Sequence, residues 1–155
     1  MLYFCTVASE QHKSVYDPSM DQNELRLIAE DCATIAWAKF SRLYTLKKPC
    51  PTIIINNRLK TTAGRCDYTL RVIDLAPIMF AENISEYKRV IIPHEIAHQV
   101  AWDIYNAPGH CPKWKSIMVK FGLSPDRCHT LSSSAMRKSR RALCVRKFIR
   151  SMLDE

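Results

Sequence analysis

Residues 94–98 read HEIAH, which fits the pattern HExxH. On a helix, His94 and His98 lie one turn apart on the same face, so both imidazoles can hold one ion. Zinc is suited to two neutral nitrogen ligands at this spacing. Glu95 is turned away from the histidines by about a third of a revolution, which leaves its carboxylate outside the ligand set but within reach of a water at the ion. The motif therefore predicts a zinc site with Glu95 as the general base.

A catalytic zinc ion needs a third protein ligand and one open position. His110 is the main candidate, because it follows a break at residues 107–109 where the chain can turn back over the metal. Spacing alone favours an ordinary surface histidine at this position, so the choice stays open. The other candidate ligands are Asp103, Glu86 and, more weakly, Cys111, Cys128 and His129.

The surroundings of the motif argue against an accidental match. HExxH arises by chance in on the order of one in several hundred chains of this length. Here Ile92, Ile96, Val100 and Ile104 recur every fourth residue, which predicts a packed helix with a defined direction for its histidines. The longer pattern HExxHxxGxxH is not met, because Ala101 occupies the glycine position.

The elements around the motif predict an α+β domain, with a small three-stranded sheet packed against helices. Apolar residues recur at helical spacing over residues 21–46, and they place Trp37 and Phe40 in the core. Pro49 and Pro51 end the helical pattern, and strands are expected at 52–56 and, as a pair, within 61–75.

Further helices are expected on the C-terminal side of these strands. One should run from an N-cap at Ser85 to about Tyr105, with Pro93 either kinking it or marking its effective start. A short helix is predicted at 112–121, and a basic amphipathic helix at 132–153. The domain proper is predicted to cover 1–130, and the basic helix or tail 131–155.

Composition narrows the class of protein. With 155 residues, 47% of them hydrophobic, the chain can bury a core as one domain. The net charge of +8 fits either a polyanion partner such as nucleic acid or a solvated basic surface. The seven cysteines include no CxxC pair, which favours reduced thiols. The apolar opening lacks a basic n-region, so we expect a cytoplasmic protein without a membrane segment.

Five segments, taken in order, resemble the SprT family, which includes the Spartan proteases acting on DNA-bound protein. They read AGRCDY, VIDLAPIMF, VIIPHEIAHQVAWDIY, GHCPKWKSIM and FGLSPDRCH. The resemblance implies a minimal zincin-like metalloprotease domain with one catalytic Zn²⁺ ion, and it makes His110 the expected third ligand. Pro93, directly before the first histidine, is similar to SprT sequences. The implied substrates are proteins near DNA, as in repair of DNA–protein crosslinks.

One departure from the family concerns the C-terminal part. SprT proteins commonly carry a cysteine-rich zinc ribbon after the protease core, whereas this chain has only Cys128 and Cys144 there, without paired spacing. A second zinc ion is therefore not expected, and the basic segment is a candidate for the DNA contact. The candidate nucleic-acid-binding residues are Arg137, Lys138, Arg140, Arg141, Arg146, Lys147 and Arg150. Further basic residues that could extend this surface are Lys47, Lys48, Arg58, Lys60, Arg65 and Arg71.

Two other functions are compatible with parts of the sequence. In the first, the zinc site only stabilises a nucleic-acid-binding module. In the second, HExxH is accidental and the chain is a metal-independent adaptor domain. For the protease, the group that stabilises the oxyanion is open between Tyr105, His129 and nearby arginines, and the sequence does not fix the oligomeric state.

Overall fold

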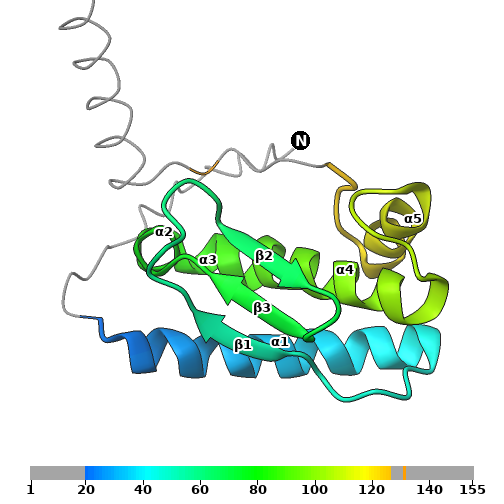
Figure 1. The fold of residues 1–155 in the computed structure, drawn as a ribbon, viewed down its shortest axis with the longest axis horizontal. Helices are drawn as coiled ribbons and strands as arrows, with labels where there is room; N and C mark the ends of the chain where they lie inside the picture. The colour runs from blue at the N-terminus through cyan, green and yellow to red at the C-terminus, as the bar shows by residue number, and fades with distance from the viewer. Residues whose placement is uncertain (1–19, 127–130, 132–155) are drawn as a thin grey trace, which may run out of the picture.

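The structure is a computed structural model and describes residues 20–126 and residue 131. A long helix, three short strands and a series of helices follow one another along this part of the chain (Figure 1). The elements are α1 (Gln22–Tyr44), β1 (Thr52–Ile55), β2 (Gly64–Asp67), β3 (Val72–Leu75), α2 (Pro77–Glu82), α3 (Ile84–Glu86), η1 (Tyr87–Ile91), α4 (Ile92–Tyr105) and α5 (Pro112–Phe121). The predicted α+β class, with a small three-stranded sheet, is confirmed.

Helix α1 forms where the apolar spacing predicted it. The side chain of Asp21 caps its first turn by accepting a hydrogen bond from the backbone N–H of Asn23, and Thr45 ends it in the left-handed conformation. One face of the helix enters the core, including Trp37 and Phe40 as predicted. The buried residues of this face are Leu25, Ala29, Ala33, Ala36, Trp37 and Phe40.

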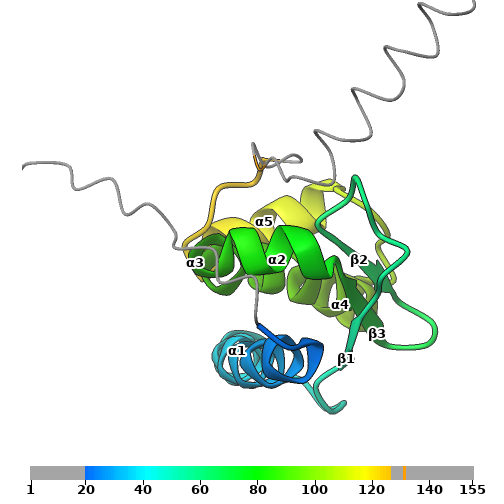
Figure 2. The same ribbon diagram turned by 90° about the vertical axis from the view of Figure 1, so that its left-hand side faces the viewer.

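The sheet has the strand order β1-β3-β2, with β3 parallel to β1 and antiparallel to β2. As the central strand, β3 is buried over Ile73, Asp74 and Leu75, and Arg65 of β2 forms an ion pair with Asp74 at 2.5 Å. Helix α1 packs against β1, and α4 packs against β2. Figure 2 shows the helices gathered on one side of the sheet, so β2 runs alongside the helix that carries the histidine motif.

The path into α4 differs from the sequence prediction in two places. Helix α2 was not predicted, and the N-cap prediction at Ser85 is wrong, because Ser85 lies inside the short helix α3. The break falls at Asn83 instead, whose backbone leaves the helical region and whose side-chain amide donates to the carbonyl of Met79. Pro93 lies in the first turn of α4, where a missing N–H is tolerated.

A π-helical turn, η1, leads directly into α4 and carries Tyr87 into the core. The hydroxyl of Tyr87 donates a hydrogen bond to the carbonyl of Ala63 at 2.9 Å and approaches the carbonyl of Ala76 at 3.4 Å. The backbone at one end of the β2–β3 pair is thereby tied to the helical segment that leads into the histidine motif.

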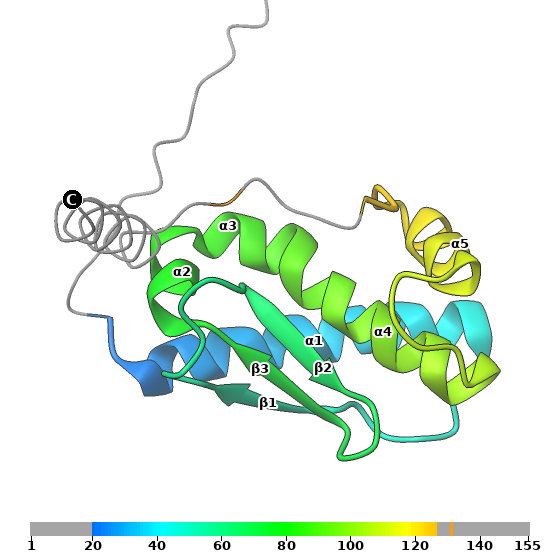
Figure 3. The same ribbon diagram turned by 45° about the horizontal axis from the view of Figure 1, so that its top comes forward.

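Helix α5 has the predicted bounds of 112–121 and packs against α4 (Figure 3). The predicted helix at 132–153 and the domain boundary at 130/131 lie outside the described residues. Within the described part of the chain, no helix is both long and apolar enough to cross a membrane.

Candidate metal centre

Two of the three predicted ligands are placed by helix α4. His94 and His98 are four residues apart, and their Nε2 atoms lie 3.3 Å from each other. The stripe that orients them is buried at Ile92, Ile96 and Val100, each 0% exposed. The helix therefore aims both imidazoles at one point, as the spacing predicts.

The third predicted ligand comes from the loop between α4 and α5. Helix α4 ends when Asn106 adopts the left-handed conformation (φ 49°), and Gly109 adopts it again (φ 63°). These two reversals bring the chain back across α4, and the Nε2 atom of His110 lies 3.1 Å from that of His94. The structure thus brings together the three histidines predicted as ligands.

The arrangement of nitrogens fits a zinc ion. Ligand nitrogens that lie about 2.0–2.1 Å from a tetrahedral ion are about 3.3 Å from one another. The two measured separations are 3.1 and 3.3 Å, and the ligand atoms of all three residues lie within 4.8 Å of each other. Among the described residues, His94, His98 and His110 form the group that could hold a metal ion.

The alternative ligands lie elsewhere or are engaged otherwise. Asp103 accepts hydrogen bonds from Arg71, Lys48 and Gln99. The carboxylate of Glu86 lies 3.8 Å from the guanidinium of Arg89. Neither belongs to the histidine group, nor does Cys111. Cys128 and His129 lie outside the described residues.

Burial keeps the imidazole of His98 neutral. His98 is 6% exposed, and burial, together with the neighbouring His94 and His110, lowers the pKa of its imidazole to about 3. The neutral imidazole is the form that binds metal ions. Trp114 of α5 is fully buried behind the cluster, with ring centroids 4.5–5.0 Å from all three histidines. The ring of Trp114 thus restricts the orientations that the three imidazoles can adopt.

Glu95 lies beside the histidines, against strand β2. Its side chain lines a pocket together with His94, His98 and His110. It is 8% exposed, and burial raises the pKa of its carboxyl to about 8. A Cβ atom placed on Gly64 would lie 3.0 Å from Cγ and 3.2 Å from Oε1 of Glu95. The glycine therefore allows the strand to approach the carboxylate closely.

Comparison with known proteins shows the family of this chain. The sequence model described as "SprT-like family" matches residues 33–133, which is more than half of the chain. The chain belongs to the SprT-like family. No solved structure matches it significantly.

Several curated bacterial relatives are named Protein SprT. The SprT-like chain is 35% identical to that of Vibrio parahaemolyticus over 101 residues, covering 64% of this chain and 58% of the relative. It is 30% identical to that of Pasteurella multocida over 111 residues, covering 70% and 64%. For Shewanella oneidensis the identity is 30% over 120 residues, covering 76% and 73%. The chain thus spans about three fifths of the length of the first two relatives.

The sequence did not predict several residues of this SprT-like site, among them Trp114 of α5 and, in the segment AGRCDY, Gly64 and Tyr68. Gly64 borders Glu95, and Tyr68 lines the same pocket. A glycine opening a strand signals a close approach of another group, which could have drawn attention to Gly64. Nothing in the local pattern singles out Tyr68. Tyr105, considered earlier for the oxyanion, is 43% exposed and does not line this pocket.

Three of the basic residues considered for a nucleic-acid surface are held in ion pairs. Arg71 contacts Asp103 at 2.7 Å, Lys48 contacts Asp103 at 3.2 Å, and Arg65 pairs with Asp74. The residues from Arg137 to Arg150 lie outside the described residues, so their role stays a prediction.

Proposed function

We propose that this SprT-like protein is a zinc-dependent endopeptidase that acts on DNA-associated proteins, including proteins crosslinked to DNA. The observation that carries the proposal is the convergence of three histidine Nε2 atoms, two pairs of them 3.1 and 3.3 Å apart, in a pocket that Glu95 also lines. A cluster that only stabilised the fold would not need a buried carboxyl beside it.

In this proposal each residue has one task. His94, His98 and His110 hold the ion as neutral imidazoles. Zinc, when bound, supplies a Lewis acid that activates water and polarises a peptide carbonyl. Glu95 takes a proton from the attacking water and returns it to the leaving amine. Burial raises the pKa of this carboxyl to about 8 in the metal-free protein, and a dication held by the neighbouring histidines would lower that pKa, so the group can accept and return a proton near neutral pH. The enclosing strand β2 keeps the carboxyl away from bulk water.

The DNA part of the proposal rests on charge and family resemblance. The chain carries a net charge of +8. The predicted contact is the basic segment with Arg137, Lys138, Arg140, Arg141, Arg146, Lys147 and Arg150. We expect the protein to act in the cytoplasm, with nucleoid or nuclear association through DNA. If DNA recruits the substrate, activity should rise with added DNA and fall steeply between about 50 and 200 mM salt, because phosphate contacts release counterions.

The test is cleavage of a DNA-bound protein by the full chain, with and without DNA. Glu95→Gln should retain zinc and lose cleavage, whereas His98→Ala and His110→Ala should also lose most of their affinity for zinc. Glu24→Gln is a matched control, because Glu24 is exposed in the first turn of α1 and should leave both properties unchanged. Undiminished proteolysis by Glu95→Gln would end the proposed mechanism.

A second candidate is a nucleic-acid-binding module whose zinc site is purely structural, which the +8 charge also fits. Metal analysis does not separate the two functions, because both include bound zinc. Wild-type protein that binds zinc and DNA but cleaves no DNA-bound protein, itself included, would favour this second function.

A further inference from the structure

Tyr68 connects strand β2 to the loop that carries His110. It follows Asp67, whose side chain accepts hydrogen bonds from the backbone N–H groups of Thr69 and Leu70 and so closes a tight turn after the strand. From this turn the phenol reaches across α4, and its oxygen accepts a hydrogen bond from the backbone N–H of Gly109 at 3.0 Å. Gly109 directly precedes the third histidine.

The tyrosine is itself held at two further points. Its ring stacks on that of Trp102, with centroids 5.3 Å apart and planes 18° apart. Its main-chain carbonyl accepts a hydrogen bond from the side-chain amide of Gln99 at 3.3 Å. Gln99 is fully buried, and the same amide nitrogen donates to Asp103 at 3.1 Å. Both Trp102 and Gln99 belong to α4, so Tyr68 is fixed relative to the helix that carries His94 and His98.

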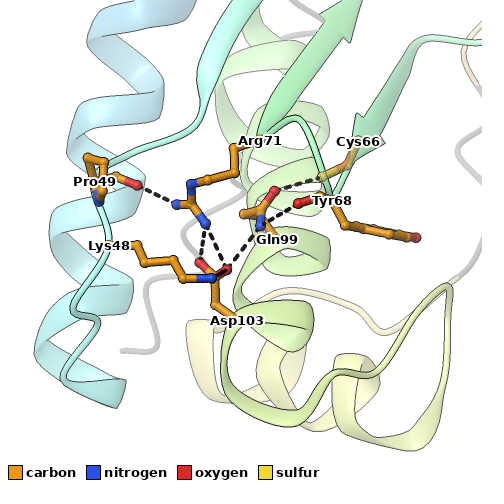
Figure 4. A network of polar contacts seen from close by, with 7 residues as sticks. All are labelled: Lys48, Pro49, Cys66, Tyr68, Arg71, Gln99 and Asp103. Atoms are coloured by element: carbon orange, nitrogen blue, oxygen red, sulfur yellow. Dashed lines mark hydrogen bonds and ion pairs between the residues drawn. The ribbon is translucent and has the colours of Figure 1, made fainter.

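This anchoring continues through Asp103, which lies on the same face of α4 as Gln99, to Arg71 and Lys48 (Figure 4). Asp103 accepts two hydrogen bonds of 2.7 Å from Arg71, and Arg71 also donates to the carbonyl of Pro49 before β1. Lys48 adds a contact to the same carboxylate at 3.2 Å. The β2–β3 turn, including Tyr68, is therefore tied to α4 by charged hydrogen bonds as well as by ring stacking, and it can serve as a fixed support.

The loop that depends on this support has an unusual backbone. Gly109 adopts a left-handed conformation (φ 63°), and a Cβ atom on it would meet no atom within 4 Å. Earlier in this loop, the hydrogen bond from the backbone N–H of Ala107 to the carbonyl of Ala101 is long, at 3.4 Å. Whereas His94 and His98 inherit their direction from helical hydrogen bonds, His110 depends on contacts that the loop makes with other elements.

We propose that Tyr68 is a positioning residue for the third metal ligand: its hydroxyl holds the Gly109 N–H and thereby keeps the His110 imidazole turned toward His94 and His98. This inference rests on the metal site of the proposed function, but not on proteolysis. Groups that orient metal ligands are typically worth about 10- to 100-fold in metal affinity, and one neutral hydrogen bond falls at the lower end of that effect.

The test compares Tyr68→Phe with the matched control Tyr105→Phe in the full chain. Phenylalanine retains the ring that stacks on Trp102 and removes only the hydroxyl, whereas Tyr105 is 43% exposed and lies outside the pocket. Zinc affinity is measured by chelator competition on metal-free protein, and folding by thermal melting. Tyr68→Phe should raise the zinc dissociation constant about five- to tenfold, and Tyr105→Phe should leave it unchanged.

A second background separates positioning from a general loss of structure. In a His110→Ala protein the ligand that Tyr68 positions is absent, so adding Tyr68→Phe should not weaken the residual zinc binding further. An equal fold-loss in both backgrounds, or no loss in the wild-type background, would overturn the inference. If Tyr68→Phe weakens zinc binding in the wild-type background and not in the His110→Ala background, while no protein substrate is cleaved under any condition, the inference stands and the proposed protease activity fails. A wild-type protein that binds no zinc would overturn both.

Discussion

The close approach of strand β2 to Glu95 makes Gly64 a sensitive position, and Gly64→Ala is a direct probe of the proposed general base. The new Cβ atom would lie 3.0 Å from Cγ, 3.2 Å from Oε1 and 3.3 Å from Cδ of Glu95. Carbon atoms in van der Waals contact are normally about 3.5–4.0 Å apart. To remove this steric overlap, the Glu95 carboxylate must move by about 0.5 Å. The side chain has little room to do so, because it is 8% exposed and lies against the strand.

The expected effects on activity and on stability differ in size. A misplacement of about 1 Å at a reacting group can cost about 100-fold in rate, so about half of that displacement should lower kcat roughly tenfold. Overpacking costs about 1–3 kcal/mol, whereas replacing glycine by alanine recovers about 0.4–1 kcal/mol by restricting the unfolded chain. The net loss of stability should thus be about 1–2 kcal/mol, too little to unfold a typical domain.

The assay is cleavage of a DNA-bound protein at saturating zinc, together with zinc content and melting temperature. Gly122→Ala is the control, because Gly122 ends α5 at φ 93° with no atom near its missing Cβ, and alanine there should strain the backbone without touching Glu95. The control should lose stability but not kcat. Wild-type kcat in a folded, zinc-loaded Gly64→Ala protein would refute the assignment of Glu95 as the base that β2 positions.

Two predictions concern stability and pH. Burial raises the pKa of Glu95 from 4.5 to about 8, so the metal-free folded protein retains a proton that the unfolded chain releases. The contribution of Glu95 to stability should therefore fall as the pH rises through this range, opposed below about pH 6.5 by the rise that the lowered pKa of His98 adds. Metal-free Glu95→Gln should lack this fall, and parallel melting curves of the two proteins across this range would contradict it. Burial also raises the pKa of Asp103, but its hydrogen bonds, chiefly from Arg71, outweigh burial and leave the pKa below 3.8. Asp103→Asn should therefore be about 2 kcal/mol less stable than the wild type at pH 7 in urea unfolding. The difference should shrink as the pH falls through the lowered pKa of the wild-type carboxyl.

The parts of this fold that the sequence predicts well are those set by local periodicity. The repeat of apolar residues places α1 within two residues of its observed ends, and Pro112 and Gly122 bracket α5 at the predicted positions. The same regularity aligns His94 with His98. Short segments are different, because α2 has six residues and its start at Pro77 follows β3 after a single residue. So brief a pattern is dominated by tertiary packing, and the break at Asn83 rather than Ser85 has no strong local signal.

The candidate metal site also combines features that local sequence predicts with features that depend on tertiary contacts. Two of the proposed ligands and the proposed base are placed by helical geometry, which a single motif encodes. The proposed third ligand follows two left-handed residues, and its loop is hydrogen-bonded to a hydroxyl from a turn 41 residues earlier in the chain. Local spacing does not encode the contact between Gly109 and Tyr68, so spacing alone favours an ordinary surface histidine at position 110. The order of the segments that resemble the family favours His110 as a ligand. A loop ligand held by a distant side chain can be adjusted without disturbing the helix. Substitutions in the β2–β3 turn should therefore tune metal affinity in this protein, while substitution of His94 or His98 should abolish the site.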